Sequence, residues 1–268
     1  AASDVYKRQN KTLNAAMFWI STSLDPTNNY DGWVLSRIGV GETLLKLNEK
    51  YEVEPCLAKS YEQIDDTTWK LTLKDSITFS NGKKVTGENV KSCLERAFEK
   101  NTRAIDYFDL NHVEAKGQDI YLYLNKSSGA ILNNLCEPLF TIYDASQSEE
   151  DIANHPLCTG PFVVDDFVSE KTIDTSKNKK YYDGKAKLDH VHFSQVTDSD
   201  ARVLALQSGE VDLANTIDYS SLKLFRNNKD YQVLEVLGPR TNVIYMNNET
   251  TFLSDLTLSL IHISEPTR

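Results

Sequence analysis

The sequence predicts a mixed α/β (α+β) protein, and three features of the chain lead to that prediction. Residues 67–75, TTWKLTLKD, alternate apolar and polar side chains, which is the period of a strand with one face in water. Residues 86–100, TGENVKSCLERAFEK, instead place Val90, Cys93, Leu94, Ala97 and Phe98 at helical spacing. No period of roughly 20 to 50 residues repeats, and strands and helices alternate without a strict βαβ rhythm.

Turn and cap residues support the elements that follow in the chain. Asn81-Gly82 predicts a two-residue hairpin turn of type I′, whose central residues both need positive φ. Thr86 is a suitable N-cap for the helix that begins next. A second hairpin is expected over residues 112–124, with its turn at Gly117.

Shorter elements are predicted over the rest of the chain. They are a helix within 130–140 that stops near Pro138, two strands within 159–175, a strand within 181–196 at the edge or in the core of a sheet, a helix that starts at Asp198 or Ser199 and ends at Gly209, a strand beginning at 211–213, a short helix within 218–228, and two strands around Gly238-Pro239. We expect Ala201, Leu204, Ala205 and Ser208 to share one face of the helix that ends at Gly209.

Composition argues against nucleic-acid binding and against a membrane-spanning helix. The net charge is −10, from 29 basic and 39 acidic residues, and no basic block is present, so nucleic acid is not expected as a partner. No apolar run approaches the roughly 18 residues that a membrane-spanning helix needs.

The residues that most often carry catalysis or bind metals form no recognisable motif. Cys56, Cys93, Cys136 and Cys158 show no CxxC spacing; Cys93 is expected to be buried, and a Cys136–Cys158 disulfide is left open. His190 and His192 share a strand face but have no identifiable third ligand, so a solvated pair at the sheet edge is favoured over a metal site. Gly39 and Gly41 lack a phosphate-loop pattern and are interpreted as structural. We therefore expect neither an enzyme nor a cofactor.

Aromatic and basic side chains do gather in one stretch. Tyr30, Trp33 and Arg37 would share one face if the segment 28–44 is helical. They would either pack and pair within the protein, or form a ligand-binding stripe with an arginine for a carboxylate and aromatic rings for apolar groups. The residues alone leave both interpretations open.

Six segments share motifs with one known family. They are 54–62 (EPCLAKSYE), 67–98, 158–164 (CTGPFVV), 178–193 (NKKYYDGKAKLDHVHF), 205–214 (ALQSGEVDLA) and 243–249 (VIYMNNE). Together they resemble the extracytoplasmic solute-binding proteins of the peptide/nickel type, family 5, which serve ABC importers. The sequence departs from the family pattern at Cys56, Cys158 and Tyr182.

The resemblance implies one lobe of a type II periplasmic-binding-protein clamshell that closes over its ligand. Lobe one would comprise residues 10–44 and 156–243, with an inserted subdomain at 45–155, and residues 244–257 would begin a second lobe that is otherwise missing.

The resemblance also implies ligand-binding residues. Arg103 could correspond to an arginine that binds metal chelates in nickel-binding members, and it joins Tyr30, Trp33 and Arg37 as a candidate. Where those members have another arginine, just before Pro138, this chain has Glu137.

The function implied is capture of oligopeptides or dipeptides outside the cytoplasmic membrane for delivery to an ABC permease. The alternative is a nickel-chelate binding protein, and a hydrolase is a remote alternative. We expect a monomer whose only membrane contact is a lipid anchor upstream of this segment.

Both ends resemble a sequencing adapter read in opposite directions. Asp4–Gln9 and Leu258–Ile263 can be encoded by complementary strands of one DNA element. Residues 1–9 and 258–268 are therefore expected not to be native.

Overall fold

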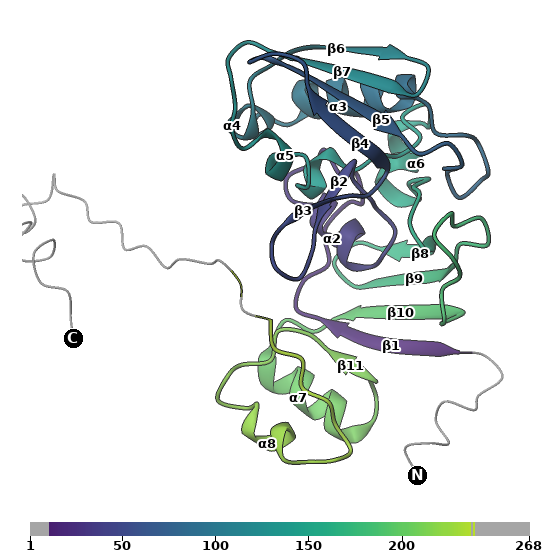
Figure 1. Cartoon of the computed structure of the whole chain (residues 1–268). Helices are drawn as coiled ribbons and strands as arrows, with labels where there is room; N and C mark the ends of the chain where they lie inside the picture. Colours follow the sequence, from purple (N-terminus) through teal and green to yellow (C-terminus); the bar gives the residue numbers. More distant parts are fainter. Residues whose placement is uncertain (1–10, 237, 239–268) are drawn as a thin grey trace, which may run out of the picture. The chain divides into compact units, whose positions relative to one another are not determined.

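The computed structural model describes residues 11–236 and residue 238 of a chain that forms two compact units, 1–230 and 231–268. The first unit contains every helix and strand described below (Figure 1). In the second unit, residues 231–236 form no helix or strand. The first of the two strands predicted around Gly238-Pro239 is therefore not formed over these residues, and the second lies outside the described part.

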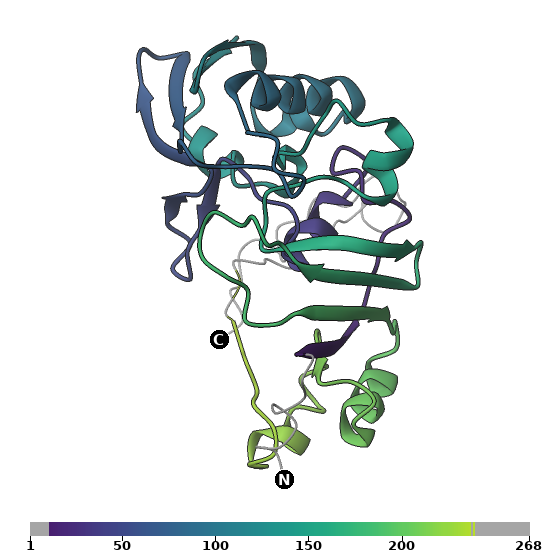
Figure 2. The same cartoon turned by 90° about the vertical axis from the view of Figure 1, so that its right-hand side faces the viewer.

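A five-stranded mixed sheet joins segments that are far apart in the sequence. Its order is β11-β1-β10-β9-β8, and β1 lies parallel to both β10 and β11 (Figure 2). The strands are β1 (Thr12–Met17), β8 (Phe162–Val168), β9 (Thr172–Lys177), β10 (His190–Gln195) and β11 (Leu213–Ala214). The predicted strand with His190 and His192 is thus an inner strand of the sheet, not an edge strand.

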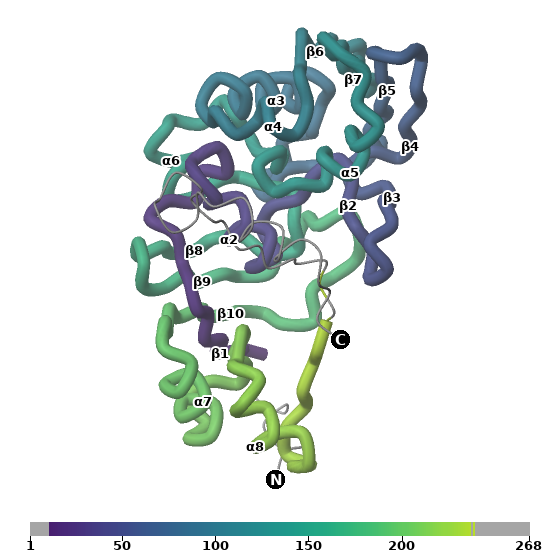
Figure 3. The backbone as a smooth tube through the Cα atoms, turned by 90° about the vertical axis from the view of Figure 1, so that its left-hand side faces the viewer, coloured from purple at the N-terminus to yellow at the C-terminus, as the bar shows by residue number. Residues whose placement is uncertain are grey.

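A four-stranded antiparallel sheet is built from one continuous stretch of chain. Its order is β4-β5-β7-β6, and α3 packs against β6 and β7 (Figure 3). The strands are β4 (Ala58–Gln63), β5 (Thr68–Leu73), β6 (Leu110–Lys116) and β7 (Asp119–Leu124), and a separate pair is formed by β2 (Leu45–Leu47) and β3 (Val53–Pro55). The strand at 67–75 and the hairpin at 112–124 are confirmed.

The helices are mostly short. They are α2 (Gly32–Arg37), α3 (Gly87–Lys100), α4 (Ala104–Tyr107), α5 (Ile131–Asn134), the 3₁₀ helix η1 (Pro138–Phe140), α6 (Glu149–Asn154), α7 (Ser199–Ser208) and α8 (Lys223–Arg226). Thr86 caps α3 as predicted, because its hydroxyl accepts a hydrogen bond from Asn89 N and the Asn89 side chain reaches back to Thr86 N. Gly209, at φ 75°, ends α7.

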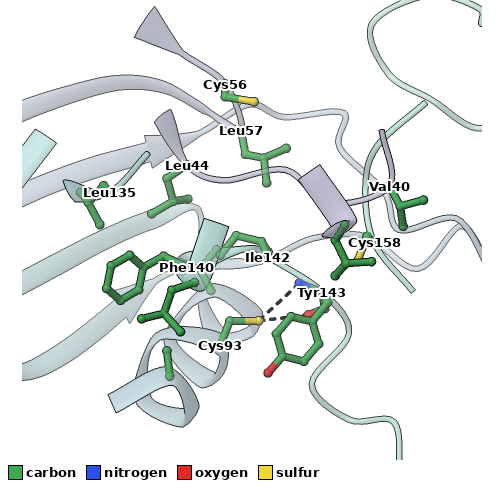
Figure 4. Close-up of a cluster of buried hydrophobic side chains, with 14 of the residues drawn as sticks. Val40, Leu44, Cys56, Leu57, Cys93, Leu135, Phe140, Ile142, Tyr143 and Cys158 are labelled. Carbon is green, nitrogen blue, oxygen red and sulfur yellow. Dashed lines mark hydrogen bonds between the residues drawn. The ribbon is translucent and has the colours of Figure 1, made fainter. Parts of the chain in front are cut away.

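One continuous apolar core links the two sheets. It includes Val90, Cys93, Leu94 and Ala97 of α3, all predicted to face inward. Figure 4 shows Cys93 beside Tyr143, to which its thiol donates a hydrogen bond (Sγ to O, 3.1 Å). A second, small cluster consists of Ala16, Ala205 and Val211.

One local prediction is wrong, and on α7 the residues predicted to share a face are mostly not the buried ones. The turn at Asn81-Gly82 is not type I′, because only Gly82 has positive φ (92°); Phe79 and Lys83 instead close a three-residue loop. The buried residues of α7 are Arg202, Val203 and Ala205, whereas Leu204 is 65% exposed. The physical reason is that Arg202 has backbone carbonyl partners around it, which allow a charged side chain to take the inward position.

Candidate functional site

The four predicted ligand-binding residues lie in two stacks of guanidinium groups and aromatic rings. Arg103 Cζ lies 3.8 Å from the centre of the Tyr30 ring. Arg37 Cζ lies 5.6 Å from the Trp33 ring and 5.4 Å from the Phe18 ring. Trp33 and Arg37 belong to α2, while Tyr30 precedes its first turn. The stretch therefore forms a helix only from Gly32, but Tyr30 still contributes to the cluster.

Close backbone packing fixes the position of α2. A Cβ atom on Gly32 would lie 2.3 Å from Pro138 O, so only glycine allows the start of α2 to touch η1. At the other end, Gly39 has φ 71° and Gly41 would bring a Cβ within 2.9 Å of the Thr141 side chain. Both glycines serve the turn after α2, as the structural interpretation of this stretch predicts.

The contact between α2 and η1 brings Trp33 next to Glu137. Trp33 Nε1 donates a hydrogen bond to Glu137 Oε1 over 2.9 Å. Glu137 is the residue before η1, and its position is set by the buried residues Pro138, Leu139 and Phe140 that follow. The side chain that differs from the nickel-binding pattern thus lies inside the candidate site.

Arg103 is fixed by neighbours on both sides. Its Nη2 donates to Tyr107 Oη over 2.7 Å, and its Nη1 donates to the carbonyl of Asn29 over 3.1 Å. The same carbonyl accepts a hydrogen bond from the buried Asn101 side chain, which closes the end of α3 onto the loop before α2. These contacts restrict the guanidinium to the face of the Tyr30 ring.

Tyr107 lies beside Arg103 and near Glu137. Burial, together with the negative charge of the nearby Glu137, raises the pKa of Tyr107 to about 12. The phenol therefore stays neutral at physiological pH, where it accepts the hydrogen bond from Arg103. Sequence reasoning missed Tyr107, although its spacing of four residues from Arg103 is the spacing of side chains that meet on a helical turn.

The cluster presents aromatic surface and charge to the outside. Tyr30 is 54% exposed and Trp33 is 38% exposed. Exposed aromatic rings next to two guanidinium groups can bind an apolar or planar group together with an anion. Glu137 adds a hydrogen-bond acceptor. The arrangement is suited to binding.

The histidines and cysteines do not contribute to this cluster. His192 Nδ1 lies 2.6 Å from Asp174 Oδ1 of the neighbouring strand, and His190 is exposed. Within residues 11–236, no three His, Cys, Asp or Glu side chains form a group that could hold a metal ion.

All four cysteines are free, so the disulfide left open for Cys136 and Cys158 is not formed. Burial raises the pKa of the Cys93 thiol to about 12 and those of Cys56 and Cys136 to about 11. It also holds the pKa of Cys158 well above its ordinary value. Thiols that remain protonated are weak nucleophiles.

Among the described residues, we find no helix with the length and apolarity needed to cross a bilayer.

Comparison with known proteins identifies relatives of the chain. The model of the bacterial extracellular solute-binding proteins, family 5 Middle, matches residues 52–258. The nickel-binding protein NikA of Staphylococcus aureus is 33% identical over 238 residues, which is 89% of this chain and 48% of the relative. The glutathione-binding protein GsiB of Salmonella paratyphi A is 27% identical, over 84% of this chain and 46% of the relative. The chain thus spans about half the length of these relatives.

Solved structures share the fold. The structure of S. aureus NikA in complex with Ni(L-His)2 matches this chain with a TM-score of 0.77 and 33% identity. The match covers 82% of this chain and 46% of the NikA chain. A nickel ABC transporter structure from Bacillus halodurans gives the same TM-score and coverage at 30% identity. The mixed α/β fold therefore corresponds to about half of these proteins, in agreement with the predicted class. This chain belongs to family 5 of the bacterial extracellular solute-binding proteins.

Proposed function

We propose that this chain is the ligand-contacting part of the substrate-binding component of an ABC importer. Family membership supports that role, and the exposed cluster of Tyr30, Trp33, Arg37 and Arg103 is the observation that carries it. Such a component needs affinity and closure rather than bond-breaking chemistry. We accordingly propose a binding protein and not an enzyme.

The proposed arrangement assigns the two sheets to one lobe. The five-stranded sheet belongs to lobe one, made of residues 10–44 and 156–243, and the four-stranded sheet belongs to the subdomain inserted at 45–155. Residues 244–257 would begin the second lobe, although they lie outside the described residues. The cluster would then face a ligand held between the lobes.

A nickel chelate is the ligand class with the most support. The nickel-binding protein NikA of S. aureus is 33% identical to this chain, and the nickel ABC transporter structure from B. halodurans is 30% identical to it. Guanidinium groups and aromatic rings can bind the organic part of a chelate through its carboxylates and its flat faces. A peptide ligand, favoured at first by the family resemblance, is the second candidate, and GsiB supports it because glutathione is a peptide.

The remaining proposals concern location and partners. The family is described as extracellular, so we place this protein outside the cytoplasmic membrane, where it would deliver ligand to the permease subunits of its importer. We propose a monomer, attached to the membrane only through a lipid anchor, and no interaction with nucleic acid.

Ligand titration followed by NMR tests these proposals, because NMR detects even weak binding. We expect nickel(II) with L-histidine to shift the indole N–H signal of Trp33, assigned with a Trp33→Phe variant, and a mixed tripeptide library without metal to shift it less. Arg103→Gln should weaken the response about tenfold, since it removes a charge-assisted contact worth about 1.4 kcal/mol.

Arg226→Gln is the matched control. Arg226 also stacks on a tyrosine, with Cζ 4.9 Å from the Tyr219 ring, but on α8. This variant should respond like the original chain. A response to the peptides alone would reject the nickel chelate, and no response of Trp33 to any probe would reject the site.

A further inference from the structure

Glu137 is an acidic side chain in a cluster that otherwise offers cations and aromatic rings. It accepts the Trp33 indole N–H, and Arg37 Cζ lies 5.6 Å from the centre of the same Trp33 ring. Its charge also acts on the nearby Tyr107, whose hydroxyl accepts a hydrogen bond from Arg103. The cluster therefore has two cationic poles and one anionic pole, all within contact of Trp33 or Tyr107.

The carboxylate is held in this place by the backbone. The Gly32 and Pro138 main chains touch, and η1 continues into the buried residues Leu139 and Phe140. The side chain of Glu137 is half-buried and starts from a fixed Cα. The backbone thus places this carboxylate within hydrogen-bond reach of Trp33.

The carboxylate also has unused hydrogen-bonding capacity. Two carboxylate oxygens offer about four acceptor sites, and the Trp33 indole N–H occupies one of them. A ligand ammonium group could occupy the others. A second ligand carboxylate in the same place would instead meet a like charge, which is unfavourable.

We propose that Glu137 selects ligands that carry an N–H cation beside a carboxylate, and disfavours ligands that carry only carboxylates. The class is thus free zwitterionic aminocarboxylates, because an amino group that binds a metal has given up its ammonium proton. This inference rests on the proposed function, because it requires the cluster to be a ligand site.

Two metal-free probes of similar length test the proposal. Glycylglycine is zwitterionic and glutarate is a dianion, and both can be titrated against the whole chain at low salt while the Trp33 indole N–H signal is followed. We expect glycylglycine to bind about threefold to fivefold more tightly than glutarate, the range for a partly exposed charge pair of up to about 1 kcal/mol. This comparison needs no variant.

Glu137→Gln then assigns the preference to the residue. The amide oxygen can still accept the indole N–H, but the negative charge is gone. We expect the preference to disappear or reverse, with tighter glutarate binding and weaker glycylglycine binding.

Glu210→Gln removes the same charge from an exposed position after α7 and controls for net charge. It should keep the original preference. Equal binding of the two probes by the original chain, or the same preference in Glu137→Gln, would overturn the role of Glu137 while leaving the site intact. A Trp33 signal that responds to neither probe in any variant would overturn the site itself.

Discussion

Two arginines with largely covered side chains stabilise different regions of the molecule in different ways. Arg96 of α3 has a side chain only 11% exposed and binds Asp25 through two nitrogens, at 2.7 and 2.9 Å. Arg202 of α7 is 3% exposed and donates instead to the backbone carbonyls of Val196, Thr197, Asn215 and Thr216, over 2.6 to 3.0 Å. One guanidinium is neutralised by a carboxylate, and the other is satisfied by peptide dipoles.

The surroundings of the two arginines explain the difference. Arg96 ties α3 to an already dense core, and it also contacts Thr27, Tyr143 and Glu149. The α7 region has a small apolar cluster and exposes Leu204, Leu213 and Tyr219. There Arg202 itself joins the segments before and after α7, because it donates hydrogen bonds to carbonyls of both. The comparison indicates that a region with little apolar core can be stabilised by one long side chain when its N–H groups donate hydrogen bonds to backbone carbonyls.

Removing Arg96 should have the largest effect. Arg96→Ala leaves Asp25 buried without its cation, and we expect a loss of about 4 kcal/mol of unfolding free energy at pH 7. Burial opposes the charged form of Asp25, but the hydrogen bonds from Arg96 and Thr27 hold its pKa below the ordinary value of 3.8. The stability from this pair is thus present above about pH 4 and is lost as the pH falls through the folded-state pKa. Urea unfolding at pH 7 and pH 3 should show a smaller cost at pH 3.

Removing Arg202 should cost somewhat less and depend little on pH. Arg202→Ala leaves carbonyls without donors, for about 3 kcal/mol in total, and carbonyls do not titrate. Hydrogen exchange should increase first at 213–217. Leu204→Ala, two residues away and 65% exposed in the parent, is the control and should change stability by less than about 0.5 kcal/mol. A cost for Arg202→Ala that falls in acid like that of Arg96→Ala would remove the distinction between the two arginines.

Asp31 is a buried carboxyl group for which the structure shows a hydrogen bond from Asn28 instead of an ion pair with an arginine. It is 2% exposed, and burial, with the charge of Asp25 adding to it, raises its pKa to about 6 despite a hydrogen bond from Asn28. Between about pH 4 and 6 the folded protein keeps a proton that the unfolded chain releases, so stability falls as pH rises through this window. Asp31→Asn should therefore stabilise the protein by about 2 kcal/mol at pH 7, allowing for partial relief of the full shift, and have little effect at pH 3.5. A constant difference across that pH range would contradict the assignment.

The smallest effect is expected at the surface. His192 and Asp174 form a cross-strand pair with side chains 39% and 45% exposed. His192→Gln should change unfolding free energy by less than about 0.5 kcal/mol, because exposed pairs are screened by water. Thermal unfolding at low and high salt checks this, and a loss above about 1 kcal/mol would show that exposure does not govern these contacts.

Elements that depend on neighbouring residues could be predicted from the sequence. The α3 helix with its Thr86 cap, strand β5 and the β6–β7 hairpin all follow from spacing and turn chemistry within a few residues. The pairing of β1 with β10 could not, because it joins residues about 178 positions apart, as Thr12 with His190 shows. Such pairings depend on the whole fold, and short segments carry little information about them.

The candidate site was predicted in part for the same reason. Tyr30, Trp33 and Arg37 are close in sequence, and the family resemblance added Arg103. Glu137 enters the cluster through the contact between Gly32 and Pro138, which is a tertiary contact, whereas Tyr107 lies four residues from Arg103 and could have been found from local spacing. On α7, a hydrophobicity pattern favours Leu204 as the inward residue, but it contains no information about the carbonyls that receive Arg202.

The missing side chain at Gly32 has a consequence for experiments on the proposed site. Because the main chains of Gly32 and Pro138 touch, exchanges at the neighbouring positions 33 and 137 leave this backbone contact itself unaltered. We therefore expect a combinatorial library restricted to these two positions to vary the proposed ligand contacts while keeping the glycine that the contact needs.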